Sequence, residues 1–111
     1  MDRDQAYLLD IVNAAQIALS YVEDIKQGEF VKNVQLQDAV IRRLEIIGEA
    51  ARRVSQEVKV ANPEVPWLAI IGMRNFMIHE YDNVDLDVIW STLKRDIPLL
   101  LEQIEKLRSV D

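Results

Sequence analysis

The chain has 111 residues, of which 50% are hydrophobic and 29% are charged, and its formal net charge is −6. This balance predicts one globular domain over residues 1–111. The absence of cysteine excludes disulfides and thiolate metal sites and fits a cytoplasmic protein. The N-terminal ten residues carry acids where a signal peptide carries bases, and no segment approaches the roughly 20 apolar residues of a membrane span.

Helical spacing of apolar residues recurs four times along the chain. The predicted helices cover, approximately, residues 3–26, 34–59, 66–80 and 86–109. Gly28 is expected to end the first helix, and Asn33 and Asp85 are placed to cap the second and the fourth. Four helices joined by short connections predict an all-α fold, an antiparallel four-helix bundle.

Several residues inside these helices predict local features. Gly48 lies mid-helix, where glycine costs about 1 kcal/mol against alanine, and the close approach of a neighbouring helix would explain it. Pro66 suits the first turn of the third helix. Pro98 should kink the last helix, because proline removes one backbone hydrogen bond and crowds the preceding turn. Trp67 and Trp90 are expected in the bundle core or at a dimer interface.

The third predicted helix carries an R-x4-H-x-Y pattern. His79 is the only histidine in the chain; Arg74 and Asn75 precede it and Tyr81 follows it. At about 100° per residue, the four side chains share roughly 160° of one helix. Arginine is a permanent cation that matches phosphate oxygens, and histidine exchanges protons near neutral pH. Each residue alone is more commonly a surface or helix-end residue, so it is the combination that predicts a site.

These residue types fit RNA cleavage without a metal ion. The reaction needs a base, an acid and a cation for the developing charge, and general acid–base help contributes about 10²- to 10⁴-fold. One chain supplies one histidine, so a twofold dimer would supply the second proton-transfer group. We therefore expect a composite site across a homodimer. Because the chain is acidic, an RNA site would also need a local basic patch.

Charged residues on the second predicted helix leave two interpretations open. Glu45 and Glu49 lie one turn apart, and an arginine-paired face is favoured over a metal site in a chain with one histidine and no cysteine. The pairs Arg42-Arg43 and Arg52-Arg53 could neutralise those acids or line an RNA cleft. Met73, Phe76 and Met77 are expected to be core residues.

Three segments resemble the HEPN ribonuclease toxins of the HepT type, and the likeness extends over nearly the whole chain. They are the string DAVIRRLEIIGEAA at residues 38–51, the run GMRN at 72–75 leading into HEY at 79–81, and the pair Ile89-Trp90. The resemblance implies a HEPN-like bundle that cleaves RNA with no cofactor and no metal. It also implies that Arg74 and His79 carry catalysis, with Asn75 beside the arginine, in a cleft formed across a homodimer.

The resemblance further implies a partner and a modification. In HepT-type toxin–antitoxin pairs the antitoxin is a minimal nucleotidyltransferase that transfers AMP to the motif tyrosine, here Tyr81. An alternative interpretation is a non-catalytic, substrate-binding subunit of a two-component nucleotidyltransferase. A plain helical dimerisation module is a third.

Overall fold

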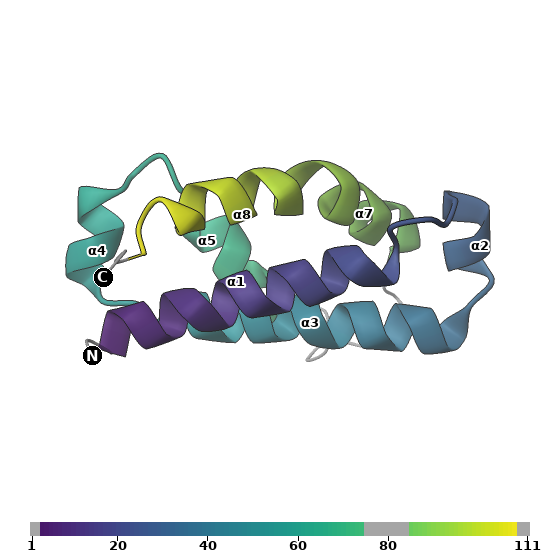
Figure 1. Ribbon diagram of the computed structural model, residues 1–111, viewed down its shortest axis with the longest axis horizontal. Coiled ribbons are helices and arrows are strands. Elements are labelled where there is room, and N and C mark those ends of the chain that lie inside the picture. Colours follow the sequence, from purple (N-terminus) through teal and green to yellow (C-terminus); the bar gives the residue numbers. More distant parts are fainter. Residues whose placement is uncertain (1–2, 75–84, 109–111) are drawn as a thin grey trace.

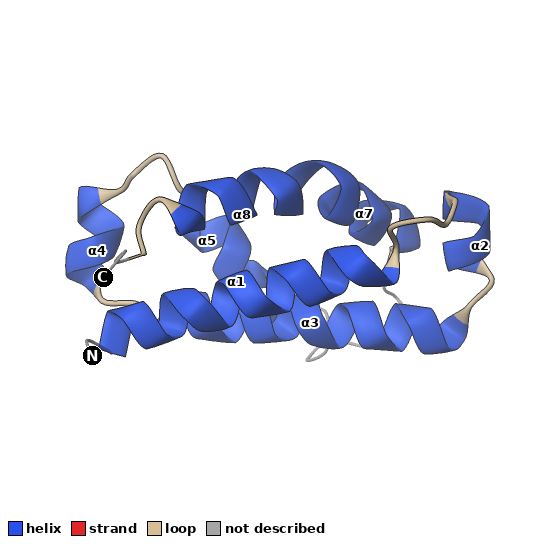
Figure 2. Cartoon of the chain, viewed as in Figure 1, coloured by secondary structure: helices blue, strands red, loops and turns tan. Residues whose placement is uncertain are grey.

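Two long antiparallel helices form the base of the molecule. The computed structural model describes residues 3–74 and 85–108, and every regular element within them is helical (Figure 2). Helices α1 (Arg3–Tyr21) and α3 (Val34–Arg53) pack side by side in opposite directions, and α8 (Ile97–Glu105) runs back along α1 (Figure 1). The predicted all-α, antiparallel bundle is confirmed.

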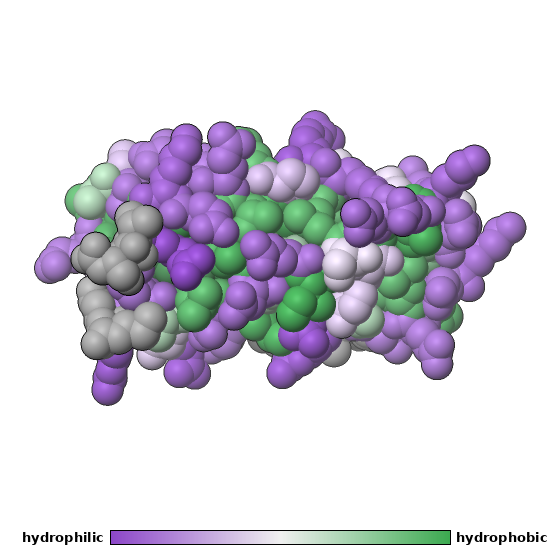
Figure 3. Space-filling view, in the orientation of Figure 1, coloured by the Kyte–Doolittle hydropathy of each residue, from purple (hydrophilic) through white to green (hydrophobic). Residues whose placement is uncertain are grey.

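The core lies between these three helices and the shorter segments that cover α3. Helix α5 (Trp67–Ile71) and the 3₁₀ turn η1 (Gly72–Arg74) pack on α3. The largest side chains with less than 2% exposure come from every layer: Leu8, Ile11, Phe30, Ile41, Leu44, Ile47, Ile70, Ile89, Leu93, Ile97 and Ile104. Polar residues cover most of the face seen in Figure 3, and apolar residues are visible in its middle. Among the described residues, no helix has the length and apolar character needed to cross a membrane.

The first helix ends earlier than predicted, and Gly28 does not end it. Helix α1 stops at Tyr21, and Gly28 lies inside a separate short helix, α2 (Gln27–Val31). Lys26 precedes α2 in an extended conformation, and its N–H donates to the Glu29 carboxylate at 3.1 Å. Phe30 of α2 is fully buried. Its burial offsets the low helix propensity of the neighbouring glycine.

The second predicted helix is two helices. Helix α3 begins at the predicted cap, where the Asn33 side chain accepts from the N–H of Leu36 at 3.0 Å. It ends at Arg53, and α4 (Gln56–Ala61) follows after Ser55, which caps it through the N–H of Val58. Asp4 on α1 accepts hydrogen bonds from both the N–H and the hydroxyl of Ser55, at 2.8 and 2.7 Å. These bonds hold the chain extended where an uninterrupted helix was expected.

The described part of the third predicted helix is tighter than expected. Pro66 precedes the first turn of α5 as its N-cap, and after Ile71 the chain narrows to the 3₁₀ turn η1. A 3₁₀ helix has three residues per turn, so the α-helical spacing ends before Arg74, and the spacing predicted between Arg74 and Tyr81 lies outside the described residues. The rest of this predicted helix lies outside the described residues. Met73 is buried as expected, whereas Phe76 and Met77 fall outside that range.

The last helix departs from α geometry directly before Pro98, as predicted. Asp85 caps α7 (Leu86–Ser91) by accepting from the N–H groups of Asp87 and Val88. A π-helical turn, η3 (Thr92–Asp96), then leads into α8, which has Pro98 in its first turn. Proline has no N–H to continue the α-helical ladder and crowds the turn before it, which accounts for the wider turn at this point.

Both tryptophans pack in the bundle. Trp67 is 7% exposed, and its indole N–H donates to the carbonyl of Asn62 at 3.0 Å. Trp90 is partly buried against Phe30, with ring centroids 5.4 Å apart, and the Lys94 Nζ lies 4.9 Å from its ring. The core interpretation is confirmed for Trp67, whereas Trp90 lies at the edge of the core with part of its surface exposed.

Candidate functional site

The candidate site lies where the backbones of η1 and α3 are in direct contact, with no side chain between them. A Cβ added at Gly48 would lie 2.7 Å from the backbone N of Arg74 and 3.0 Å from the carbonyl oxygens of Ile70 and Ile71. Contacts this short are not tolerated, so only glycine allows the two segments to meet here. The close approach expected at Gly48 is confirmed, and it sets the backbone of Arg74 directly against α3.

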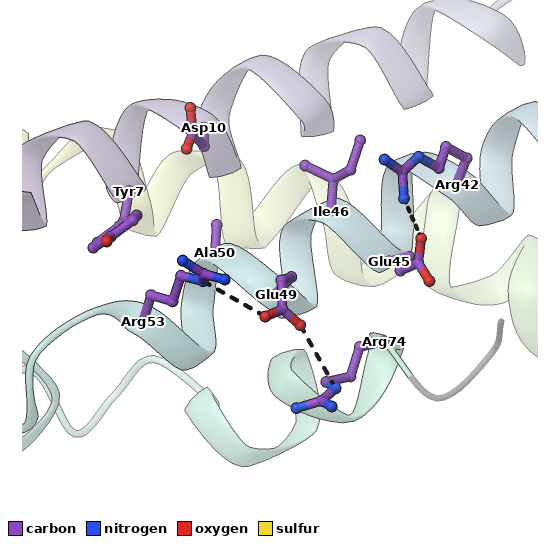
Figure 4. Close-up of a pocket in the computed structure, with 9 residues that line it drawn as sticks. All are labelled: Tyr7, Asp10, Arg42, Glu45, Ile46, Glu49, Ala50, Arg53 and Arg74. Carbon is purple, nitrogen blue, oxygen red and sulfur yellow. Dashed lines mark hydrogen bonds and ion pairs between the residues drawn. The ribbon is translucent and has the colours of Figure 1, made fainter. Parts of the chain in front are cut away.

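The Arg74 side chain extends from this junction toward Glu49, the next residue on α3 after Gly48. Its Nε lies 3.7 Å from the Oε2 of Glu49, and the side chain is 33% exposed (Figure 4). This Nε atom is buried, and it makes no hydrogen bond with any residue in the described ranges. The guanidinium is therefore held by charge rather than by a hydrogen bond of good geometry.

Glu49 is the acidic centre of a cluster of arginines. Its Oε1 accepts from the Nη2 of Arg52 at 2.7 Å and lies 3.5 Å from the Nε of Arg53. The hydrogen bond from Arg52 is the main cause that lowers the pKa of Glu49, and the charges of Arg52, Arg74 and Arg53 lower it further, against a desolvation that raises it. The carboxylate is therefore ionised at neutral pH.

A cavity of about 420 Å³ opens beside this cluster, between α1, α3 and η1 (Figure 4). Its lining residues are Tyr7, Asp10, Arg42, Glu45, Ile46, Glu49, Ala50, Arg53 and Arg74. Three arginines face three carboxylates, so the lining is formally neutral in a chain whose net charge is −6. Its volume lies within the range of small-molecule sites. An anionic ligand would meet less repulsion here than over the acidic remainder of the surface.

The basic residues on α3 form ion pairs with its acids, and two of them also line the cavity. Arg42 forms an ion pair with Glu45, and Arg52 and Arg53 form ion pairs with Glu49. Arg42 and Arg53 also line the cavity. The expected arginine-paired face is thus confirmed. Within residues 3–74 and 85–108, no group of three or more His, Cys, Asp or Glu side chains is arranged to hold a metal ion.

Of the four predicted site residues, the structure places Arg74, on the wall of the cavity. Asn75, His79 and Tyr81 lie outside the described residues. Two lining residues on α1, Tyr7 and Asp10, were not singled out from the sequence. Their spacing of three residues puts them on one helix face, but only the packing of α1 on α3 brings that face to the cavity.

Known proteins are similar to this chain over most of its length. The family model described as "Ribonuclease HepT-like" matches residues 11–107. The candidate RNase MJ1380 of Methanocaldococcus jannaschii is 38% identical over 91% of this chain and 93% of its own length. The candidate ribonuclease HepT of Thermococcus cleftensis is 42% identical over 92% of this chain and 93% of its own. The candidate RNase TTE0752 of Caldanaerobacter subterraneus is 36% identical over 96% of both chains. No solved structure gives a significant match.

Proposed function

Because the chain belongs to the ribonuclease HepT-like family, we propose that it is an endoribonuclease that cleaves RNA without a metal ion. Arg74 binds the scissile phosphate and stabilises its developing charge, and His79 transfers the proton. Asn75 is the polar residue beside the arginine. The observation that carries the proposal is the position of Arg74, half-buried on the wall of a cavity and held next to an ionised carboxylate.

A cation in this position suits a phosphate ligand. The side chain is 33% exposed, so it is screened less by solvent than a fully exposed arginine and remains accessible to a ligand. The cavity is also the place where the arginines of α3 gather: Arg42 and Arg53 line it beside Arg74. This supplies the local basic groups that an acidic chain needs to hold an RNA backbone.

We propose that the active form is a homodimer. The chain has one histidine, and cleavage by proton transfer uses an acid and a base. An exposed apolar side chain is available for an interface on α5, the helix that precedes η1: Leu68 is 87% exposed. Sedimentation at micromolar concentration should give a dimer, and a monomer at that concentration would contradict this part of the proposal.

The test of the reaction is RNA cleavage by the purified chain. Wild type should cleave RNA in the presence of EDTA, and His79→Ala should lose about 10²- to 10⁴-fold in rate, the usual contribution of a proton-transfer group. His79→Ala should stay folded. Cleavage at the wild-type rate by His79→Ala would exclude the proton-transfer role. If wild type binds RNA or a nucleotide but does not cleave, the substrate-binding subunit would be the better interpretation.

We further propose that the chain is the toxin of a toxin–antitoxin pair and that a partner nucleotidyltransferase inactivates it at Tyr81. The phenol oxygen of Tyr81 would attack the α-phosphorus of ATP, form a phosphodiester to AMP and release pyrophosphate, with loss of the phenol proton. The added group is bulky and anionic, so it should repel an RNA phosphate from the neighbouring site.

This modification is tested by mass spectrometry after incubation with the partner and ATP. AMP-sized additions are expected on wild type and none on Tyr81→Phe, which should remain toxic in the presence of the partner. The other tyrosines, Tyr7 and Tyr21, serve as internal controls. Modification of either one, or undiminished modification of Tyr81→Phe, would contradict the assignment.

A further inference from the structure

Glu49 is the described residue that holds the charged end of Arg74. The two residues belong to different elements, α3 and η1, and their ion pair spans the junction at Gly48. The backbone of Arg74 is fixed there by its contact with α3. A fixed backbone still leaves the long side chain free to rotate about its own bonds. The contact between Nε and the carboxylate, at 3.7 Å, restricts where the guanidinium lies.

The geometry of this contact can orient the guanidinium of Arg74 without using its terminal nitrogens. Glu49 approaches Arg74 from the Nε side, and the terminal nitrogens of Arg74 extend away from Glu49 (Figure 4). The ion pair joins the Nε of Arg74, and not a terminal nitrogen, to the Glu49 carboxylate. The terminal nitrogens are the donors that form the two-pronged contact with a phosphate. An arginine held through Nε therefore keeps its terminal donors available for a ligand.

Glu49 is itself held in place by the two other arginines. Arg52 donates to its Oε1 at 2.7 Å, and Arg53 lies 3.5 Å from the same oxygen. Both are on α3, one turn further along the helix. Oε1 thus faces α3's own arginines and Oε2 faces Arg74. The carboxylate is therefore held by α3 through Oε1, and its Oε2 remains directed toward η1.

From this arrangement we infer that Glu49 is a positioning residue for Arg74, and that it orients the guanidinium for the phosphate at the scissile bond. The inference rests on the proposed function, in which Arg74 contacts that phosphate. Glu49 itself touches no substrate and acts through the arginine. Since it is also an acid on the cavity wall, removing its charge should favour RNA binding, whereas losing its hold on Arg74 should slow the reaction.

The charge effect and the positioning effect can be separated kinetically. Glu49→Gln makes the formally neutral lining positive by one unit, which favours RNA binding, so KM should stay the same or fall. The freed guanidinium samples more orientations, and misplacement by about 1 Å costs on the order of 10²-fold in rate. We therefore expect kcat to fall about 10- to 100-fold in Glu49→Gln. Glu49→Asp keeps the charge but shortens the reach, and it should retain an intermediate kcat.

Glu105 offers a matched control. It pairs with Arg108 at 3.4 Å, with side-chain exposures of 42% and 32%, close to the 38% and 33% of Glu49 and Arg74. It lies on α8 and does not line the cavity. Glu105→Gln removes the same charge from a similar ion pair, so kcat and KM should both stay near their wild-type values. If Glu49→Gln and Glu105→Gln have the same kcat, or if Glu49→Gln only raises KM, the inference is overturned.

A double variant tests whether the effect passes through Arg74. In an Arg74→Lys background the guanidinium is absent, so adding Glu49→Gln should lower kcat by less than twofold further. An undiminished loss in that background would mean that Glu49 acts elsewhere and would overturn the inference. The Nε–H signal of Arg74 in NMR spectra, assigned by its loss in Arg74→Lys, should shift in Glu49→Gln and stay unchanged in Glu105→Gln.

The same measurements separate failure of this inference from failure of the proposed function. A wild-type chain without RNA cleavage, or an Arg74→Ala variant that cleaves as wild type does, would overturn the proposed function and this inference with it. An active wild type, an impaired Arg74→Ala and a Glu49→Gln variant identical to Glu105→Gln would overturn only the role of Glu49.

Discussion

Two arginine–glutamate pairs have their glutamates on the same helix, α3, and they differ in what they connect: Arg42 with Glu45, and Arg74 with Glu49. Arg42 and Glu45 are three residues apart on α3. Their ion pair is local to one helix and would form wherever that helix is exposed. The second pair joins α3 to η1. It exists only because the chain returns to α3 at Gly48.

The difference shows that residue type and helical spacing do not by themselves define a site. Glu45 and Glu49 lie one turn apart on α3, and both face arginines on their own helix. Within residues 3–74 and 85–108, Glu49 is the one of the two that also meets an arginine from a second element. Both acids line the cavity, and backbone packing at Gly48 decides which of them pairs with Arg74. The difference between the two pairs can be tested by substituting the residues of each pair, and of the junction at Gly48, in turn.

The largest expected difference is in the rate of RNA cleavage after substitution of Arg74 or of Arg42. Arg74→Ala should lower the rate of RNA cleavage by about 10²- to 10³-fold, the usual cost of removing a donor that stabilises developing charge. Arg42→Ala should lower it no more than a few-fold, because the Arg42 side chain is 62% exposed and serves at most to attract RNA. Cleavage rates of the two variants, measured under the same conditions, check this ordering.

Arg108→Ala is the control for the arginine comparison, because Arg108 is as exposed as Arg74 and also pairs with a glutamate. It should cleave RNA at the wild-type rate. Equal losses in Arg74→Ala and Arg42→Ala would mean that the local pair matters as much as the pair between elements, and would remove the basis of the comparison.

The next largest effect concerns the glycine that brings the elements together. Gly48→Ala places a methyl group 2.7 Å from the backbone N of Arg74. Forcing an extra carbon into a packed junction should lower the free energy of unfolding by about 1–3 kcal/mol. Gly28→Ala is the matched control, because nothing lies within 4 Å of its added Cβ. It should raise the free energy of unfolding by about 0.5–1 kcal/mol. Urea denaturation of both variants would measure these changes, and a neutral Gly48→Ala would contradict the tight junction.

Much of the bundle could be predicted from local patterns. Apolar periodicity located the long helices α1 and α3, and Asn33 and Asp85 cap α3 and α7 as their residue types predict. The disturbance before Pro98 and the close approach at Gly48 were also correctly predicted, since each follows from what proline and glycine do to a backbone.

The missed features depend on contacts between distant residues. The break after α3 depends on Asp4, which lies 51 residues from Ser55 in the sequence. Burial of Phe30 keeps α2 helical although it contains Gly28. At the site, the partner of Glu49 on η1 could not be read from spacing on one helix. Tertiary contacts of this kind decide between local alternatives that the sequence leaves equally plausible.

A smaller effect is expected where α3 ends, because that end fixes the positions of Arg52 and Arg53. The Ser55 hydroxyl caps α4 and donates to Asp4. Ser55→Ala should lower the free energy of unfolding by about 1 kcal/mol, the typical cost of losing an N-cap. Ser20→Ala is the control: the Ser20 hydroxyl is exposed and bonds only within its own helix, so its loss should change stability by no more than about 0.5 kcal/mol. Equal effects in thermal melts would argue against a special role for the Asp4–Ser55 contact.

The smallest effect is the pH dependence of the Glu49 cluster. Hydrogen bonding from Arg52, together with the charges of Arg52, Arg74 and Arg53, lowers the pKa of Glu49 below its ordinary value of 4.5. A carboxylate with a lowered pKa contributes stability that is fully present above the unfolded-state pKa and is lost as pH falls through the folded-state value. Glu49→Gln should therefore be slightly less stable than wild type at neutral pH. The difference should stay within about 1 kcal/mol, because exposed ion pairs contribute little. It should shrink at pH values below 4.5. Urea midpoints of the two proteins over this pH range measure it, and a difference that grows as pH falls would show that Glu49 stabilises the fold in its protonated form instead.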